Sequence, residues 1–298
     1  MKPFIAAGAL LLITGCSAGN STVAPLPTTP TTSTTASTAS ASTGPIGSVP
    51  KPDHVVVVME ENHSYGDIVG SADAPYLNAL AGQGALFTSS FAVAHPSEPN
   101  YVALFSGSTQ GLTDDSCPHT FAADNLGAQL SSARLGFTGY SEDLPSVGDP
   151  SCTAGGYARK HSPWSNFPTV PAADSQPFSA FPTDYSRLPA VSFVIPNLTD
   201  DMHDGTIAEG DTWLRSHLDG YAQWAKAHHS LLIVTWDEDD YSQANQIPTM
   251  IVGQQAKPGR YGERIDHYSV LRTLETMYGL PALGQAASAA PITDCWSP

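Results

Sequence analysis

The sequence is poor in positive charge. Lysine and arginine together number 12 in 298 residues, against 28 aspartate and glutamate residues, which gives a formal net charge of −16. Phosphate backbones and anionic lipid headgroups are held mainly by lysine and arginine. The composition therefore argues against nucleic acid and against electrostatic docking on a membrane surface. If the substrate is an anion, a local cation must receive it.

Long apolar runs are also missing beyond the N-terminus. Lys2 is followed by an apolar run to Ile13 that is too short to span a bilayer and has the form of a secretory signal. Residues 13–16, Ile-Thr-Gly-Cys, resemble a bacterial lipobox, which predicts removal of residues 1–15 and lipidation of Cys16. The alternative is a plain signal peptide with an accidental cysteine. We expect an exported protein, either a cell-surface lipoprotein or secreted, with acyl chains as its membrane link.

Cysteine is scarce as well, with only four residues. Export permits disulfides, and Cys117 and Cys152 both lie in segments rich in glycine, proline and serine, so we predict that they pair. Closing this loop would stabilise the fold by roughly 4 kcal/mol in the chain-entropy model. Cys295 is then left over, as a free thiol or an intermolecular link.

Residues 16–52 consist almost entirely of serine, threonine, alanine, proline and glycine. Such a segment buries too little apolar surface to offset the entropy lost on ordering. The composition predicts a disordered stalk, which is a candidate for O-glycosylation. We expect the folded domain, which would carry the chemistry, to span residues 53–298.

Within that domain, short unbroken apolar runs alternate with helical patterns. The runs are typical of strands buried on both faces of a parallel sheet. They cover residues 54–59, 191–196, 231–236 and 249–252, and the helical patterns cover residues 75–86, 206–227 and 268–278. This alternation predicts an α/β fold in which helices sandwich a mostly parallel central sheet. Residues 106–190, rich in proline, glycine and serine, are predicted to be mostly loop.

Polar side chains directly follow three of the predicted strands, at residues 60–64, 197–204 and 237–240. Ligands of open α/β sheets bind beyond the carboxyl ends of the strands, so we expect one shared site. Two carboxylates about 4 Å apart repel by roughly 4 kcal/mol at a near-surface dielectric, and a divalent metal ion removes this cost. Oxygen ligands favour Mg²⁺, Ca²⁺ or Mn²⁺ over copper, although the identity of the metal, Zn²⁺ included, stays open.

The third polar segment contains four consecutive carboxylates. Asp237 and Glu238 lie next to the strand, and we predict that they ligate the metal. The alternative is that the carboxylates point into water and cap a helix. We prefer that alternative for Asp239 and Asp240, because turn positions favour aspartate.

Ser97-Glu98-Pro99 has the form of a helix start, with Ser97 as the N-cap. A cap alone would explain the pattern. The functional alternative uses the same position, because a helix N-terminus favours an anion such as phosphate. A serine hydroxyl bound there to a metal would be activated as a nucleophile.

Three adjacent cationic or titratable residues, Arg159, Lys160 and His161, occur in a chain that has few. They would suit contacts to phosphoryl oxygens, although a solvated basic turn remains the alternative for Arg159 and Lys160. Asp266 or His267 could open the last predicted helix. We consider a catalytic role for His267 the weaker interpretation.

Five ordered motifs resemble the phosphoesterase family of bacterial acid phosphatases and phospholipases C, within the alkaline-phosphatase-like superfamily. The motifs are MEENHSY, HPSEPNYVALFSGSTQG, ARKHSPW, IPNLTDDMHDG and VTWDEDD. The resemblance spans residues 53–294 and is greatest to the secreted acid phosphatases of mycobacteria. It implies an alkaline-phosphatase-like α/β core with a metal at the strand ends.

The resemblance also implies a set of metal ligands. Glu61 and Asn62 match the Glu-Asn pair of the family, and Asp237 and Glu238 match the acidic pair that completes its metal site. The family pair is often followed by Arg-Ser-Phe. In this chain His-Ser-Tyr follows at residues 63–65, so the pocket wall is expected to differ.

Three further residues match catalytic positions of the family. Ser97 matches the nucleophile, which is also a metal ligand. His161 and His203 match histidines that are implied to contact the phosphoryl group and to protonate the leaving alcohol.

These patterns predict a metal-dependent acid phosphatase that acts on phosphorylated small molecules or lipids through a phosphoserine, and we expect a monomer. One alternative is a phospholipase C-type phosphodiesterase that uses the same residues. The chain lacks room for the extra C-terminal domains of the larger family phospholipases, which favours the phosphatase modestly. The other alternative is a non-catalytic surface lipoprotein whose acidic rim binds Ca²⁺ or a partner.

Overall fold

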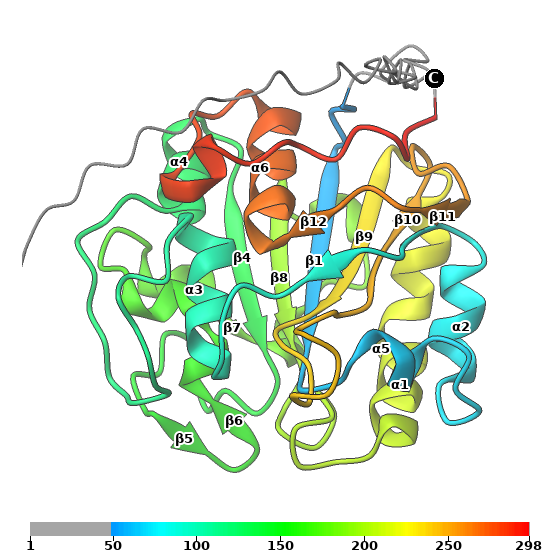
Figure 1. Cartoon of the computed structure of the whole chain (residues 1–298). Coiled ribbons are helices and arrows are strands. Elements are labelled where there is room, and N and C mark those ends of the chain that lie inside the picture. The colour runs from blue at the N-terminus through cyan, green and yellow to red at the C-terminus, as the bar shows by residue number, and fades with distance from the viewer. Residues whose placement is uncertain (1–48, 298) are drawn as a thin grey trace, which may run out of the picture. The chain divides into compact units, whose positions relative to one another are not determined.

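A computed structural model describes residues 49–297 (Figure 1). The predicted signal peptide, the lipobox cysteine and nearly all of the stalk lie outside the described residues. The centre of the fold is one eight-stranded sheet. From edge to edge its strands are β11 (Gly259–Tyr261), β2 (Ala85–Phe87), β10 (Thr249–Gly253), β9 (Ser230–Trp236), β1 (His54–Glu60), β8 (Val191–Ile195), β4 (Phe137–Ser141) and β7 (Ser175–Pro177). Only β10 runs antiparallel to its neighbours among these described strands.

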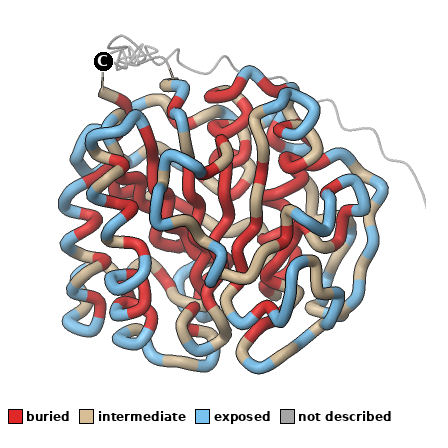
Figure 2. Tube along the Cα trace, turned by 180° about the vertical axis from the view of Figure 1, so that it is seen from behind, coloured by how far each residue is buried: buried red, intermediate tan, exposed pale blue. Residues whose placement is uncertain are grey.

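Helices cover both faces of the sheet, which confirms the predicted α/β fold (Figure 1). The helices are α1 (Tyr65–Ile68), α2 (Pro75–Ala81), α3 (Ser97–Ser106), α4 (Leu126–Ser132), α5 (Ile207–Ala225) and α6 (His267–Tyr278). Apolar side chains of α3, α4 and α6 pack on one face, and those of α2 and α5 pack on the other. Buried residues follow the strands and the inner sides of the helices (Figure 2).

The central strand β1 shows why the apolar runs are unbroken. Val55 and Val57 pack toward α3 and α6, whereas Val56 and Val58 pack toward α2 and α5, and all four are fully buried. Successive side chains of a strand point to opposite faces, so a strand covered on both faces needs apolar residues at every position. β1 pairs with β9 over seven residues, which fixes where both strands end.

The predicted helix over residues 75–86 ends early, because α2 stops at Ala81 and residues 85–87 form β2. Gly82 caps the helix. At Gly84 a Cβ would lie 2.3 Å from the carbonyl oxygen of Ile251, so only glycine allows the chain to enter the sheet this closely.

The prediction that residues 106–190 are mostly loop missed α4 and two strands of the central sheet, β4 and β7. β4 contains Gly139, where a Cβ would lie 2.2 Å from the Trp164 ring. The glycine lets this buried indole pack flat against the strand, and it interrupts the apolar run that would have identified the strand.

Helices α5 and α6 match their predicted ranges closely. Thr206 caps α5 and accepts a hydrogen bond from the backbone of Glu209, while Asp266 caps α6. Asp266, rather than His267, therefore opens the last helix. No described helix is both long and apolar enough to cross a lipid bilayer.

The far end of α3 is locked to the C-terminal part of the chain. Gly107 ends the helix in a left-handed conformation, and its carbonyl accepts a hydrogen bond of 2.7 Å from the backbone N–H of Gln285. A Cβ on Gly107 would lie 2.2 Å from the carbonyl oxygen of Leu283, and one on Gly284 would lie 2.3 Å from that of Gly107. Backbone meets backbone here, and neither glycine has room for a side chain.

The predicted disulfide between Cys117 and Cys152 is present. Cys295 has no disulfide partner among the described residues, and its complete burial favours a free thiol over an intermolecular link.

Candidate active site

The ends of β1, β8 and β9 are joined by backbone hydrogen bonds just beyond the sheet. The N–H of Asp237 donates to the carbonyl of Glu60 at 2.9 Å, and the N–H of Glu61 donates to the carbonyl of Asp201 at 2.8 Å. The three polar segments that follow the strands therefore meet at one place, as the topology rule predicts. Helix α3 brings Ser97 to the same place.

Ser97 is buried among carboxylates. Its hydroxyl donates to Glu61 Oε2 at 3.0 Å and lies 3.4 Å from Glu238 Oε1. The predicted N-cap role of Ser97 is wrong, because Pro96 is the N-cap and Ser97 is the first helical residue. The hydroxyl of Ser97 does not cap the helix, which leaves it free to face the strand ends.

Glu61 is the centre of the cluster and is fully buried. Its Oε2 faces Ser97, while its Oε1 accepts a hydrogen bond from the Tyr101 hydroxyl and lies 3.1 Å from His161 Nε2. Burial raises the pKa of Glu61 well above its ordinary value, and the charges of Asp237 and Asp201 add to the shift. A proton or a cation is therefore needed to make this arrangement favourable.

Asn62 and Asp237 contribute two oxygen atoms that have no hydrogen-bond partner, although both are buried. The backbone N–H of Asn62, a residue with a φ of 52°, donates to Asp237 Oδ1 at 3.1 Å. This contact leaves Asp237 Oδ2 and Asn62 Oδ1 without partners. Burial raises the pKa of Asp237 to about 7. Unpartnered carboxylate and amide oxygens beside Glu61 and Ser97 form a donor set that fits a hard divalent cation.

A second group of possible ligands shares Glu61. One ligand atom from each of Glu61, His161 and Asp201 lies within 4.8 Å of the other two. His161 Nδ1 is 3.1 Å from Asp201 Oδ2, and the His161 ring stacks on Tyr101 with centroids 4.9 Å apart. Burial lowers the pKa of His161 and raises that of Asp201 to about 7. Histidine and carboxylates at this spacing also suit a divalent metal.

His203 lies at the more exposed side of the cluster. Its Nδ1 donates to Asp204 Oδ1 at 2.8 Å, and its Nε2 lies 3.4 Å from Lys160 Nζ. The His203 and His161 rings have centroids 5.9 Å apart. This arrangement presents Nε2 of His203, beside an ammonium group, next to the buried cluster.

Lys160 and Arg159 have different roles, although they are adjacent. Lys160 forms a 2.9 Å ion pair with Asp115 and reaches His203, so it belongs to the site. Burial lowers the pKa of Lys160, but the Asp115 hydrogen bond and the charge of Glu61 outweigh it and raise the pKa. Arg159 instead donates to the carbonyls of Pro150 and Ser165 and supports the loops.

The predicted division of the four carboxylates is wrong at Asp239, which is buried rather than solvated. Its oxygens accept backbone hydrogen bonds from Tyr241, Gln243 and Asn245 at 2.8–2.9 Å, because the following loop folds back over it. Only Asp240 is exposed, as predicted. Turn preference alone therefore did not distinguish an aspartate that organises a loop from one that faces water.

His95 completes this side of the site, and the sequence analysis assigned it no role. Its Nδ1 lies 2.6 Å from Glu238 Oε2 and its Nε2 lies 3.3 Å from Asp239 Oδ1. The exposed Tyr241 stacks on the His95 ring with centroids 4.0 Å apart. His95 thus fixes the orientation of the Glu238 carboxylate.

His267 contacts the site only through the backbone. Its Nε2 donates to the carbonyl of Trp236 at 3.0 Å, and burial lowers its pKa. None of its described hydrogen bonds reaches a carboxylate of the cluster, and its buried Nδ1 has no partner among the described residues.

Three further residues of the site, Asp201, Tyr101 and Asp115, were not predicted from the sequence. Tyr101 follows Ser97 by four residues, so both lie on one face of α3 and both reach Glu61. That spacing could have identified Tyr101. Asp201 was one of several acidic residues after β8, and Asp115 lies in a loop without a pattern, so neither could be selected from the sequence.

Comparisons with known proteins relate the chain to phosphatases. The chain is 57% identical over 246 residues to phosphatidylinositol-3-phosphatase of Mycobacterium tuberculosis, covering 82% of each chain. It is 30% identical over 258 residues to an acid phosphatase of Aspergillus fumigatus, covering 80% of this chain and 57% of that protein.

Solved structures show the same fold at low identity. A protein of the alkaline phosphatase superfamily from Vibrio parahaemolyticus gives a TM-score of 0.58 at 13% identity, covering 83% of this chain and 72% of that one. The lipoteichoic acid synthase LtaP of Listeria monocytogenes gives a TM-score of 0.57 at 11% identity, covering 80% and 75%. At such identity the likeness concerns the fold alone. The phosphoesterase family model matches residues 71–281, and the chain therefore belongs to this family, as a hydrolase of phosphate esters.

Proposed function

We propose that the chain is a metal-dependent acid phosphatase that hydrolyses phosphomonoesters through a phosphoserine formed on Ser97. One observation carries this proposal. The Ser97 hydroxyl, at the N-terminus of α3, is held by Glu61 and Glu238 in a buried group of carboxylates. A serine in this setting has both an acceptor for its proton and a helix N-terminus that favours the incoming phosphate.

Five residues would hold the metal: Glu61, Asn62, Ser97, Asp237 and Glu238. The unpartnered oxygens of Asn62 and Asp237 support this set, and His161 and Asp201 are further donors at its edge. When bound, a divalent ion supplies positive charge that lowers the pKa of a serine hydroxyl and stabilises negative charge on phosphoryl oxygens. It also provides the local positive field that a chain of net charge −16 otherwise lacks.

In the proposed reaction Ser97, Glu61 and His203 each carry out a separate step. The Ser97 Oγ attacks phosphorus, and its proton passes to the Glu61 carboxylate that it already contacts at 3.0 Å. The bond from phosphorus to the leaving oxygen breaks, and Nε2 of His203 supplies the proton that this oxygen needs. In the second half of the reaction water attacks phosphorus and gives a proton to Nε2 of His203. The bond from phosphorus to Ser97 Oγ breaks, Glu61 returns its proton to Oγ, and inorganic phosphate leaves.

His161 and the first turn of α3 serve the phosphoryl group. His161 is held in place by Asp201 at 3.1 Å and by the stacked ring of Tyr101, so its Nε2 is preorganised at the cluster. In the first turn of α3 the Glu98 N–H donates to Asp115 and Pro99 has no N–H, so the Ser97 N–H is the backbone donor that we propose to stabilise charge on the phosphoryl oxygens. Lys160, beside His203, adds a further positive charge at the exposed side.

The names of the relatives favour a monoesterase over a phosphodiesterase, because the similar proteins are named phosphatases. The 57% identical relative is named for a phosphoinositide, so we include phosphorylated lipid headgroups among the proposed substrates. The predicted N-terminal signal and lipobox support export, and we propose that the reaction takes place at the cell surface or outside the cell.

Hydrolysis of p-nitrophenyl phosphate tests the proposal. Ser97→Ala removes the attacking oxygen, and we expect kcat to fall by at least about 10³-fold. Ser106→Ala is the matched control, because Ser106 is buried in the same helix and donates to the Val102 carbonyl, away from the carboxylates. Activity that survives both Ser97→Ala and chelation would rule out the mechanism. Greater turnover of bis(p-nitrophenyl) phosphate or phosphatidylcholine would instead favour the phosphodiesterase.

A further inference from the structure

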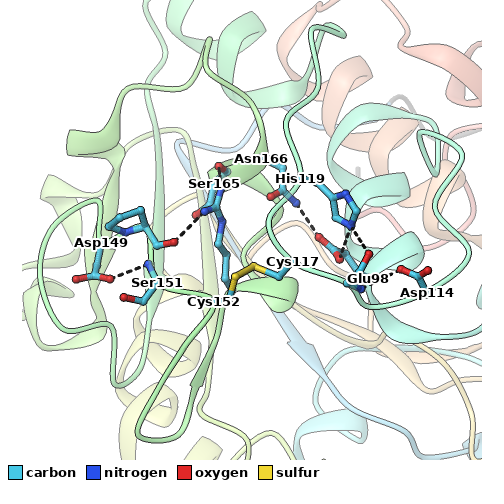
Figure 3. The surroundings of a disulfide bond; sticks show 12 residues. Glu98, Asp114, Cys117, His119, Asp149, Ser151, Cys152, Ser165 and Asn166 are labelled. Atoms are coloured by element: carbon cyan, nitrogen blue, oxygen red, sulfur yellow. Dashed lines mark hydrogen bonds and ion pairs between the residues drawn. A yellow bond between two sulfur atoms is a disulfide. The ribbon is translucent and has the colours of Figure 1, made fainter.

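A disulfide joins two loops that flank the site (Figure 3). Cys117 lies in the connection between α3 and α4, and residues 107–125 of this connection form neither helix nor strand. Cys152 precedes a small hairpin of β5 (Thr153–Ala154) and β6 (Tyr157–Ala158). At the base of the hairpin the N–H of Arg159 donates to the carbonyl of Cys152 at 2.9 Å, which places Lys160 immediately beyond the disulfide.

Asp115, two residues before Cys117, connects three parts of the site. Its Oδ1 accepts the backbone N–H of Glu98, next to Ser97, at 2.9 Å. Its Oδ2 accepts from Lys160 Nζ at 2.9 Å, and the same ammonium group lies 3.4 Å from His203 Nε2. One carboxylate thus contacts the first turn of α3 and, through Lys160, the histidine proposed as the acid.

The same loop also contacts the side chain of Glu98, which is buried at the start of α3. Asn166 donates to Glu98 Oε1 at 2.8 Å, and His119 Nε2 lies 3.6 Å from Oε2 (Figure 3). Asp115 and His119 stand on either side of Cys117, so the cysteine lies between two contacts to the first turn of α3.

Polar contacts alone hold such a loop weakly. The Lys160–Asp115 pair is partly exposed, with 18% and 27% of the side-chain surfaces accessible. An ion pair of this exposure contributes little by itself, because water screens it and two side chains must be ordered. The covalent link between Cys117 and Cys152 keeps both partners of the pair close.

We propose that Asp115 is a positioning residue for phosphate-ester hydrolysis and that the Cys117–Cys152 disulfide holds it in place. Asp115 orients Lys160 toward His203 and fixes the first turn of α3 under Ser97. The proposal rests on the proposed function, since it requires Ser97 and His203 to act on the substrate. It follows that activity depends on the oxidised disulfide at temperatures where the reduced chain is still folded.

Reduction provides the first test. A phosphine reductant supplies two electrons that convert the disulfide into two thiols, and the assay is run with excess divalent metal, well below the unfolding midpoint of the reduced protein. We expect kcat for p-nitrophenyl phosphate to fall about 10- to 100-fold with little change in KM. Cys117→Ser with Cys152→Ser should match the reduced wild type and should not respond to reductant. A response of this double variant would show that the reductant acts elsewhere, and the proposal would be wrong.

Substitution of the aspartate provides the second test. Asp115→Ala removes both contacts and should lower kcat about 10- to 100-fold, whereas Asp115→Asn keeps an acceptor for Glu98 and should restore part of the loss. Asp114→Ala is the matched control, because Asp114 lies on the same loop, is exposed and contacts only Ser116. Asp114→Ala should retain wild-type activity.

Combining the changes separates positioning from stability. If the disulfide acts through Asp115, adding Asp115→Ala to the cysteine double variant should cost no further activity. The inference is wrong if the loss caused by Asp115→Ala multiplies the loss caused by the cysteine substitutions. It is also wrong if the oxidised and reduced proteins have equal activity. Ser97→Ala separates this inference from the proposed function. If Ser97→Ala is inactive while the wild type is equally active with and without the disulfide, the proposed function stands and only the role of Asp115 and the disulfide is refuted.

Discussion

The four carboxylates at residues 237–240 differ in burial, and this difference predicts the effect of each substitution. Asp237 is fully buried with an unpartnered oxygen, whereas Asp240 is exposed. We expect Asp237→Asn to reduce kcat/KM at least about 10²-fold, because a neutral amide is a poor ligand for a hard cation. Asp240→Asn should stay within about twofold of wild type. Equal effects in a p-nitrophenyl phosphate assay would contradict this division.

Asp239 should affect stability more than chemistry. Its side chain accepts backbone hydrogen bonds from Tyr241, Gln243 and Asn245. Asp239→Ala removes the shared acceptor of these three part-buried N–H groups, and we expect the free energy of unfolding to fall by roughly 2 kcal/mol. Urea denaturation measures this loss. An unchanged midpoint would show that the loop finds other partners for these N–H groups.

The positions of some site residues could be predicted from the sequence, and those of others could not. Glu61, Ser97 and Asp237 follow strands or begin a helix, so topology alone brings them together. Asp239 could not be placed, because its burial depends on a loop that returns through Asn245. Asp115 could not be placed either, since its contacts are to residues 17 and 45 positions away. Local patterns contain no information about such contacts.

At the level of elements, α6 contains a buried carboxyl group that should make stability depend on pH. Burial raises the pKa of Glu275 to about 7, although the backbone N–H of Leu283 and the charge of Arg272 oppose the shift. Between about pH 4.5 and 7 the unfolded chain loses this proton while the folded chain keeps it, so stability falls as pH rises. Glu275→Gln cannot ionise and should be more stable than wild type at pH 8, by roughly 2 kcal/mol.

Denaturation of both proteins at pH 4.5 and pH 8 measures this effect, and the two should differ little at pH 4.5. Glu209→Gln is a control in which the pKa of the carboxyl group is shifted in the opposite direction. The exposed carboxylate of Glu209 has its pKa lowered by the backbone hydrogen bond of Thr206 at the start of α5. Its contribution is present above the unfolded pKa, so this variant should lose stability at pH 8. A Glu275→Gln variant that is less stable than wild type at pH 8 would contradict the assigned pKa.

The elements themselves were predictable where the physical signal is local. β1 and β9 are buried on both faces, and α5 repeats its apolar side chains at the helical period. The sequence therefore predicted the two strands and the helix. β4 was missed because Gly139 and polar residues interrupt it, and the Trp164 ring that covers Gly139 comes from a later segment of the chain. The early end of α2 was missed because close packing of Gly84 on β10 is a tertiary contact.

At the scale of the whole molecule, protons and the proposed metal compete for the same carboxyl groups. Burial raises the pKa of Glu61, Asp201, Asp237 and Glu238. In mild acid, protons neutralise this cluster in the metal-free chain. At pH 8 those protons are lost, and buried like charges then oppose one another unless a cation is bound.

Removal of the metal should therefore be more damaging at high pH. We expect EDTA to abolish activity and to lower Tm by several degrees more at pH 8 than at pH 5. Differential scanning calorimetry with and without added Mn²⁺ measures this difference. A larger effect of EDTA at pH 5 would mean that the cluster does not hold the metal.

The contact between Gly107 and Gly284 lies at the opposite end of α3 from Ser97. It still affects the proposed catalysis, because a small tilt of the helix about this end would displace Ser97. A helix of ten residues is about 15 Å long, so a tilt of about 5° around its C-terminal end would move Ser97 by roughly 1 Å. A displacement of that size can cost about 100-fold in rate. The C-terminal segment at Gly284 and Gln285 supplies no ligand or catalytic group to the proposed site, but its backbone contact fixes the end of α3 and with it the position of the proposed nucleophile, Ser97.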